Sequence, residues 1–209
     1  MFRASLFFIV SEMMLLRFSV YLLVLMAFLD FGCTGNKGSE ENIKQILSEL
    51  KENQTKVIMR IDGKEFYPAQ SLFTGQMTFT DQMLSLVLVD QFEGRTMLNL
   101  GGEKWYQQPI VKEVSTSNMF NASLKLGKLI DKENLIGEGY MMTDGKIEAV
   151  SFARDRIVFK ITGKVGKYSD FQQPEKYLTA DGLIVCKMPA ITWTSITEDE
   201  IFGSNKLDK

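Results

Sequence analysis

Cys33 is the residue whose position most clearly indicates a covalent chemistry. An apolar run of twelve residues, 18–29, follows Arg17 and ends shortly before this cysteine, and the polar stretch 34–42 comes directly after it. Twelve apolar residues lie within the roughly 7–15 of a signal-peptide core and fall short of the roughly 20 that a membrane-spanning helix needs. We therefore predict that residues 1–33 are a signal peptide ending in a lipidated Cys33, and that residues 34–42 are a flexible tether.

The second cysteine, Cys186, lies in the apolar run 183–188, which is typical of a β-strand. A thiol in such a run is usually a small buried hydrophobic group and not a nucleophile. If Cys33 is acylated, Cys186 has no disulfide partner within the chain. If it is not, a Cys33–Cys186 disulfide is the alternative.

The chain contains no histidine. This excludes Ser-His-Asp and Cys-His catalytic sites, histidine zinc sites and the usual general base near neutral pH. The acidic residues at 131–138 and 198–200 lack the spacing of a calcium loop, and no glycine-rich segment stands between a strand and a helix as in a phosphate site. The sequence predicts no catalytic residue, no metal and no cofactor, and it favours a protein that is not an enzyme.

The charges are balanced along the chain, with a formal net charge of −2. Nucleic-acid binding needs a concentrated basic surface, so nucleic acid is not expected as a partner.

Trp105 and Tyr106 are the candidate ligand-binding residues. They follow a pair of glycines and precede a pair of glutamines in an expected loop. Exposed aromatic rings beside amides form platforms for sugars or peptides. The alternative is that both rings cover the edge of the core. We expect Trp193 to be a core or sheet-face residue.

One amphipathic helix is expected at about residues 39–52. Ile43, Ile46, Leu47 and Leu50 have the i, i+3, i+4, i+7 spacing of a single helical stripe. We expect this stripe to pack on the sheet that follows. A helix that binds a partner or lies on a membrane is the alternative.

From residue 56 onward the apolar residues alternate, which is typical of strands. Asp62-Gly63 predicts a two-residue hairpin turn into residues 64–67, and we also expect turns at Asp144-Gly145 and Asp181-Gly182. The run 83–89 is apolar at every position but one, so we expect a strand covered on both faces. Further expected features are a turn at 90–94 into a strand at 95–100, and a strand at 156–164 that pairs with 182–188.

Helical spacing is scarce after residue 53, whereas short strands with frequent turns are common. The predicted fold is mainly β: an antiparallel β-sandwich or barrel preceded by one amphipathic helix. We expect residues 43–209 to form a single β-rich domain, with the helix at its N-terminal end.

Residues 29–33 resemble the lipobox of bacterial lipoproteins. Gly32 is the small residue wanted before the cysteine, whereas Asp30 and Phe31 depart from the pattern. The leader, the tether, the opening hairpin and the closing strands around Phe159 and Val185 resemble the small uncharacterised β-rich lipoproteins of Bacteroidota. The resemblance implies residence in the cell envelope, at the outer membrane or the periplasmic face, with lipid anchoring; it implies no catalytic residue.

These observations predict an envelope-anchored lipoprotein that acts as a non-enzymatic binding or accessory module for a protein, glycan or lipid ligand. The alternative is a lipocalin-like carrier whose barrel cavity is lined by some of the twelve methionines and fifteen phenylalanines. An enclosed apolar void would favour the carrier, and a filled core would count against it. A hydrolase without histidine is the third hypothesis.

Overall fold

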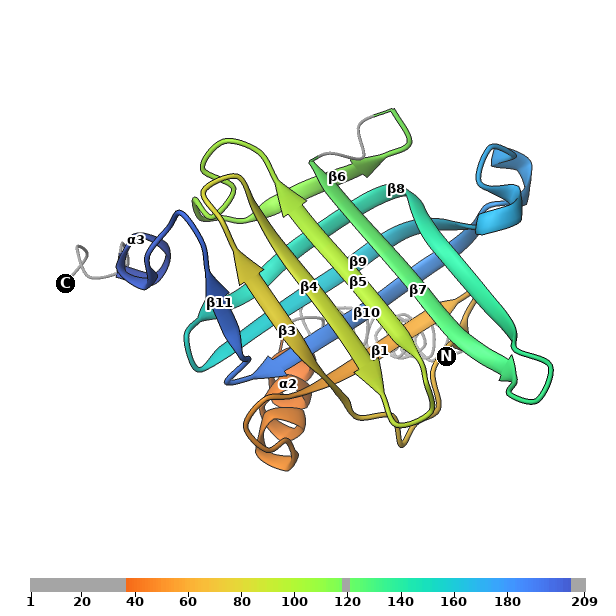
Figure 1. Cartoon of the computed structure of the whole chain (residues 1–209), viewed down its shortest axis with the longest axis horizontal. Helices are drawn as coiled ribbons and strands as arrows, with labels where there is room; N and C mark the ends of the chain where they lie inside the picture. The colour runs from red at the N-terminus through yellow and green to blue at the C-terminus, as the bar shows by residue number, and fades with distance from the viewer. Residues whose placement is uncertain (1–36, 118–120, 204–209) are drawn as a thin grey trace, which may run out of the picture. The chain divides into compact units, whose positions relative to one another are not determined.

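The computed structural model describes residues 37–117 and 121–203 (Figure 1). The predicted signal peptide, Cys33 and the first part of the predicted tether lie outside these residues, so those statements stay predictions. Among the described residues, those from Gln45 onward form one compact unit, and those up to Lys44 belong to a separate one.

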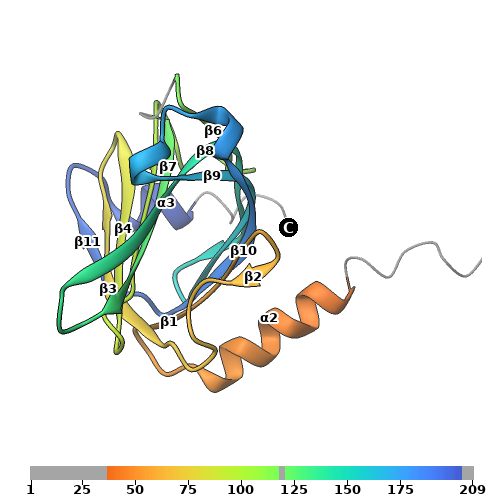
Figure 2. The same cartoon turned by 90° about the vertical axis from the view of Figure 1, so that its right-hand side faces the viewer.

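Eight strands form a closed antiparallel barrel, which confirms a mainly β fold and decides for the barrel over the sandwich. Each strand pairs with the next along the chain, and β1 closes the ring by pairing with β10 and, at Thr55 and Phe73, with β3. Figure 2 shows β3 and β4 on one wall, and β9 and β10 on the opposite wall. The barrel strands are β1 (Gln54–Ile61), β3 (Phe73–Phe79), β4 (Met83–Asp90), β5 (Arg95–Gly101), β7 (Ala122–Asp131), β8 (Ile136–Ala153), β9 (Arg156–Lys167) and β10 (Leu178–Lys187).

Smaller elements complete the described part of the chain. β2 (Lys64–Glu65) pairs with β1, β6 (Val111–Ser115) pairs with β8, and β11 (Ile191–Trp193) runs parallel to β3. The 3-10 turns η2 (Tyr168–Asp170) and η3 (Pro174–Lys176) lie between β9 and β10, and the short helix α3 (Glu198–Phe202) follows β11.

Helix α2 spans Lys37–Glu49, against the expected 39–52. The chain then turns into β1 at Asn53, whose φ is +57°. The Lys187 ammonium group donates to the carbonyl oxygens of Leu47 and Leu50, at 2.9 and 2.7 Å, so a cation satisfies the end of the helix. Among the described residues, none of the helices combines the length and the hydropathy needed to cross a membrane.

The expected turn at Asp62-Gly63 is confirmed. Both residues have positive φ, at +51° and +74°, which is the type I′ geometry that joins β1 to β2. The expected turns at Asp144-Gly145 and Asp181-Gly182 are wrong, because both dipeptides lie inside strands.

In those strands the glycines permit close approach of neighbouring backbones. A Cβ atom on Gly145 would lie 2.5 Å from the Gly163 Cα atom, and one on Gly182 would lie 2.2 Å from the carbonyl oxygen of Ile58. The Asp-Gly pattern therefore marks tight strand packing at these two places.

β4 is covered on one face only, so the prediction of a doubly covered strand is wrong. Leu84, Leu86 and Leu88 point into the barrel and are at most 2% exposed, whereas Val87 and Val89 on the outer face are each 41% exposed. The alternation predicted for residues 156–164 is confirmed, as is the pairing of that strand with residues 182–188.

The interior of the barrel is filled by side chains. A void that admitted water would leave its lining partly accessible. The inward-facing side chains of β1 are at most 7% exposed, and large inward-facing side chains on the other seven barrel strands are fully covered. They include Phe73, Met77, Leu84, Leu98, Leu124, Ile147, Phe159, Ile161 and Ile184, all 0% exposed and part of one cluster.

Cys186 lies in this core with no accessible surface, and burial raises the pKa of its thiol to about 12. The prediction of a small buried hydrophobic group is confirmed, because a thiol held protonated in this way is neither a nucleophile nor a metal ligand at neutral pH.

Candidate functional site

Trp105 covers one end of the core and is not available as a surface platform. It is 1% exposed, and its indole nitrogen donates to the carbonyl oxygen of Thr80 at 2.8 Å. Its ring packs edge-to-face against Phe79 and Tyr106, with centroids 5.3 and 5.6 Å apart. Tyr106 is half-buried against the same core. Of the two interpretations of this pair, the structure supports the one in which the rings cover the core edge.

A groove opens on the outside of the barrel, where β5, β7 and β8 run beside η2. Its volume is about 320 Å³, and it is open to solvent on one side. The groove is lined by Glu93, Arg95, Gly127, Lys128, Leu129, Gly137, Glu138, Gly139 and Tyr168. None of these residues was among the predicted site residues.

Glycines form the floor of the groove. In the sheet register Arg95 pairs with Gly127, and Gly127 pairs with Gly139, so two glycines follow one arginine in a single row across three strands. Because neither glycine carries a side chain, the row forms a flat, recessed strip of backbone.

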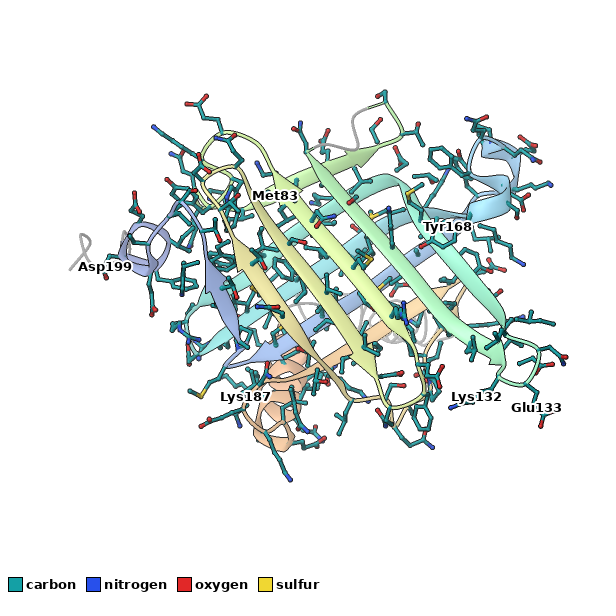
Figure 3. The ribbon with its side chains drawn as sticks, in the orientation of Figure 1. Met83, Lys132, Glu133, Tyr168, Lys187 and Asp199 are labelled. Carbon is teal, nitrogen blue, oxygen red and sulfur yellow. The ribbon has the colours of Figure 1, made fainter. Side chains whose placement is uncertain are left out.

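Tyr168 forms one wall of the groove and lies directly against Gly139. A Cβ atom at position 139 would come within 2.3 Å of the Tyr168 ring, so glycine is required for the ring to occupy this place. The tyrosine is 52% exposed, which leaves part of the ring open to a ligand. Figure 3 shows Tyr168 at the end of the molecule where β9 leaves the barrel.

Glu138 is the centre of a polar network beside the floor. Its carboxylate accepts a hydrogen bond from the Tyr140 hydroxyl at 2.9 Å and lies 3.6 and 3.7 Å from the ammonium groups of Lys128 and Lys167. Lys128 also donates to the Phe66 carbonyl oxygen at 2.9 Å and lies over the Phe66 ring, at 4.5 Å from its centroid. These contacts fix the network before any ligand arrives.

The network shifts the protonation of its tyrosine. Burial, and then the hydrogen bond to the Glu138 carboxylate, raises the pKa of Tyr140 to about 12. Tyr140 is therefore a neutral hydrogen-bond donor at physiological pH and not a general base.

Arg95 contributes the cation that is free to meet a ligand. Its carbonyl oxygen accepts a hydrogen bond from the Tyr67 hydroxyl at 2.6 Å, which fixes the backbone. The guanidinium group makes no ion pair with any residue that the structure describes, and the residue is exposed. A planar guanidinium with free donors can bind hydroxyl or carboxylate oxygens in pairs.

Apart from Glu138, the two acidic clusters include carboxylates that bind within their own loops. The Asp131 carboxylate accepts from the backbone N–H groups of Glu133 and Asn134, and Glu200 forms a capping box with Thr197 at the start of α3. The hydrogen bond from the Asn134 side-chain amide, and then those from the backbone, lower the pKa of Asp131, and the hydrogen bonds from Thr197 lower the pKa of Glu200. Within residues 37–117 and 121–203, no three or more Cys, Asp or Glu side chains are grouped so that they could hold a metal ion.

Comparisons with protein-family models, with curated proteins and with solved structures found no match. The functional conclusion therefore depends on the groove and on the chemistry of its lining.

The sequence did contain one signal for this groove. Gly127, Gly137 and Gly139 lie within two strands, and glycine within a strand often marks a close approach by a ligand or another backbone. Only the register of β5, β7 and β8 places these glycines beside Arg95.

Proposed function

We propose that this chain is a lipid-anchored lipoprotein of the cell envelope, held by an acylated Cys33, whose barrel is a non-enzymatic module that binds a saccharide in the glycine-floored groove. The observation that carries the binding part is the groove itself, with a half-exposed tyrosine over a flat floor. The anchor is supported by the apolar run 18–29 and by the cysteine that follows it.

A saccharide fits this chemistry better than a purely apolar ligand does. A sugar ring has an apolar face that packs on an aromatic ring and a hydroxyl edge that needs donors and acceptors. Tyr168 offers the aromatic face, while Arg95 offers a charged hydrogen-bonding group at the rim. A volume of about 320 Å³ is near the lower end for ligand pockets, so the ligand is short.

The two alternative functions have weaker support. A lipocalin-like carrier needs internal space, whereas the barrel interior is filled. A glycosidase needs two carboxyl groups free to act on the bond. In this groove Glu138 is held by Tyr140 and two lysines, and Glu93 is paired with Lys132.

The anchor is tested by metabolic labelling with an alkynyl fatty acid. We expect label on the wild-type chain and on Cys186→Ala, and none on Cys33→Ala, because only Cys33 stands at the junction of apolar and polar segments. Label retained by Cys33→Ala would refute acylation at this residue.

Filling the groove tests the binding proposal. A Cβ atom on Gly127 would have only the Glu138 carbonyl oxygen, at 3.9 Å, within contact distance, so Gly127→Leu places its side chain in the open groove without strain. We expect its affinity for envelope oligosaccharides on a glycan array, checked by calorimetry, to fall by about tenfold or more, which corresponds to roughly 1.4 kcal/mol.

The matched control is Lys125→Leu, on the same strand and outside the groove lining. It should bind as the wild type does, and both variants should keep the wild-type melting temperature. Binding by Gly127→Leu at wild-type affinity, or no saccharide bound by the wild type across the array, would contradict the proposal.

A further inference from the structure

Arg95 carries a positive charge in the groove that no acid of the described residues neutralises. The groove lining also contains the acids Glu93 and Glu138, and each of them has cationic partners of its own. The whole chain has a formal net charge of −2, so the free cation is not part of a general excess of positive charge. The charge of the ligand can therefore be argued from the surroundings of this one side chain.

Glu93 is held by a lysine and does not compete for the guanidinium group. It lies in the turn between β4 and β5, two residues before Arg95, and its φ is +66°. Its carboxylate lies 2.5 Å from the ammonium group of Lys132 in the turn between β7 and β8. This ion pair occupies the lining acid that is nearest to Arg95 in the sequence.

Glu138 points to the opposite face of the sheet. Side chains alternate along a strand, so Glu138 and its register partner Lys128 point away from the face that carries Gly139. The contacts of Lys128 agree with this, because its ammonium group lies 4.5 Å from the ring centroid of Phe66, which is only 5% exposed. The Glu138 carboxylate is shared by two lysines on that inner face, so it does not balance the charge of Arg95.

The cross-strand neighbours of Arg95 also leave the guanidinium group free. In the sheet register Arg95 lies between Val89 on β4 and Gly127 on β7. Valine has no acceptor atom in its side chain, and glycine has no side chain. The Tyr67 hydroxyl meanwhile fixes the backbone of Arg95 through its carbonyl oxygen. A guanidinium group on a fixed strand, with free N–H donors, is suited to a planar group with two acceptor oxygens.

The row of residues across the floor sets the distance between this charge and the aromatic wall. Gly127 pairs with Arg95 on one side and with Gly139 on the other, and Tyr168 packs over Gly139. Adjacent strands lie about 4.8 Å apart, so a group on Gly127 is one strand spacing from each neighbour in the row. A pyranose ring above Gly127 can therefore pack against Tyr168 while a substituent on its rim meets Arg95.

From this row and its unmatched charge we infer that the saccharide is acidic, with a uronic acid ring over Gly127 and its carboxylate on the Arg95 guanidinium group. The inference rests on the proposed saccharide binding and adds the chemical class of the ligand. A uronic acid carries its carboxylate directly on the pyranose ring, which suits the short spacing. A carboxylate accepts two parallel N–H bonds from a guanidinium group, and such charge-assisted bonds are about twice as strong as neutral ones.

Oligosaccharides that differ only in charge test the inference. The full chain, purified in a detergent without a sugar headgroup, is applied to a glycan array that contains neutral and uronic acid oligosaccharides. The tightest acidic ligand is then compared by calorimetry with its methyl ester, which keeps the ring and its substituent but lacks the charge. We expect the array to favour acidic glycans, and the acid to bind about tenfold or more tightly than its ester.

Variants at Arg95 assign the preference to this side chain. Arg95→Gln should bind the acid about tenfold more weakly than the wild type and the ester equally well. Arg95→Lys keeps the charge without the planar fork and should retain part of the preference. The matched control is Lys125→Gln, which removes a positive charge from β7 outside the groove lining and should keep the full preference. All three should keep the wild-type melting temperature, because Arg95 is exposed and Tyr67 binds only its backbone.

Four results would overturn the inference. These are equal binding of neutral and acidic glycans on the array, equal affinity for the acid and its ester, an acid preference that persists in Arg95→Gln, and binding of acetate or inorganic phosphate as tight as that of the acidic oligosaccharide. The first three leave the proposed function in place if Gly127→Leu, which fills the floor, loses the acid and the ester alike. A wild-type chain that binds no saccharide of either kind would instead refute the proposed function, and the inference with it.

Discussion

Gly145→Ala is expected to lower the free energy of unfolding by about 4 kcal/mol, through backbone strain of roughly 1–3 kcal/mol and overpacking of similar size. Gly145 has φ +127°, which side chains of L-residues rarely adopt. Its Cβ atom would also lie 2.3 Å from the Thr162 carbonyl oxygen and 2.5 Å from the Gly163 Cα atom. Both contacts are with backbone atoms, so β8 and β9 would have to separate.

Urea unfolding followed by circular dichroism measures this loss. The matched control is Gly127→Ala, whose Cβ atom has only the Glu138 carbonyl oxygen nearby, at 3.9 Å. Its free energy of unfolding should differ from that of the wild type by no more than about 0.5 kcal/mol. If Gly145→Ala unfolds at the wild-type urea concentration, the close approach of β8 and β9 is wrong.

Stability is expected to fall steeply in alkali, by about 5 kcal/mol between pH 8 and pH 11. Three neutral acids lie in or beside the core: burial raises the pKa of Cys186 from 9.0 to about 12, that of Tyr140 from 10.0 to about 12, and that of Tyr67 well above 10.0. Each is at most 6% exposed.

The sign of the effect follows from which state loses its proton first. Above its ordinary pKa each group is ionised in the unfolded chain but still protonated in the folded one, so the unfolded state binds fewer protons and the free energy of unfolding falls as pH rises. Each group contributes a slope of about 1.4 kcal/mol per pH unit. The stabilisation is fully present below about pH 9 and is lost from there upward, first through Cys186 and then through the two tyrosines.

Urea midpoints at about pH 8, 9, 10 and 11 measure this dependence. In Cys186→Ala the decline should begin about one pH unit later than in the wild type, and in Tyr67→Phe it should be shallower above pH 10. A midpoint that stays constant up to pH 11 would contradict the burial of these groups.

Local features of the fold could be predicted from the sequence. The Asp62-Gly63 turn and the alternation of residues 156–164 depend on neighbouring residues, so pattern and structure agree. Asp144-Gly145 is the same dipeptide as in that turn. Its glycine, however, allows the close approach of Gly163 on β9, which lies 18 residues further along the chain. Nothing in the local pattern distinguishes these two uses of glycine.

The groove was less predictable than the barrel because it depends on register. Arg95, Gly127, Gly139 and Tyr168 come from four separate segments, and only strand pairing and the turn after β9 bring them together. Trp105 was ambiguous for a different reason. An aromatic residue after two glycines fits a platform as well as a core cover, and its hydrogen bond to Thr80 decided for the cover.

The closure of the barrel determines when during folding β1 can pair with its main partner. β1 pairs with β10 over its whole length, whereas it pairs with β3 only at Phe73. The first barrel strand therefore needs the last one as its main hydrogen-bonding partner. A chain that is synthesised amino end first therefore exposes the unpaired edge of β1 until almost all of the barrel strands have been made. A chain truncated before Leu178 would lack β10 and could not close the barrel. Its unpaired strand edges would make it a substrate for quality-control proteases and chaperones.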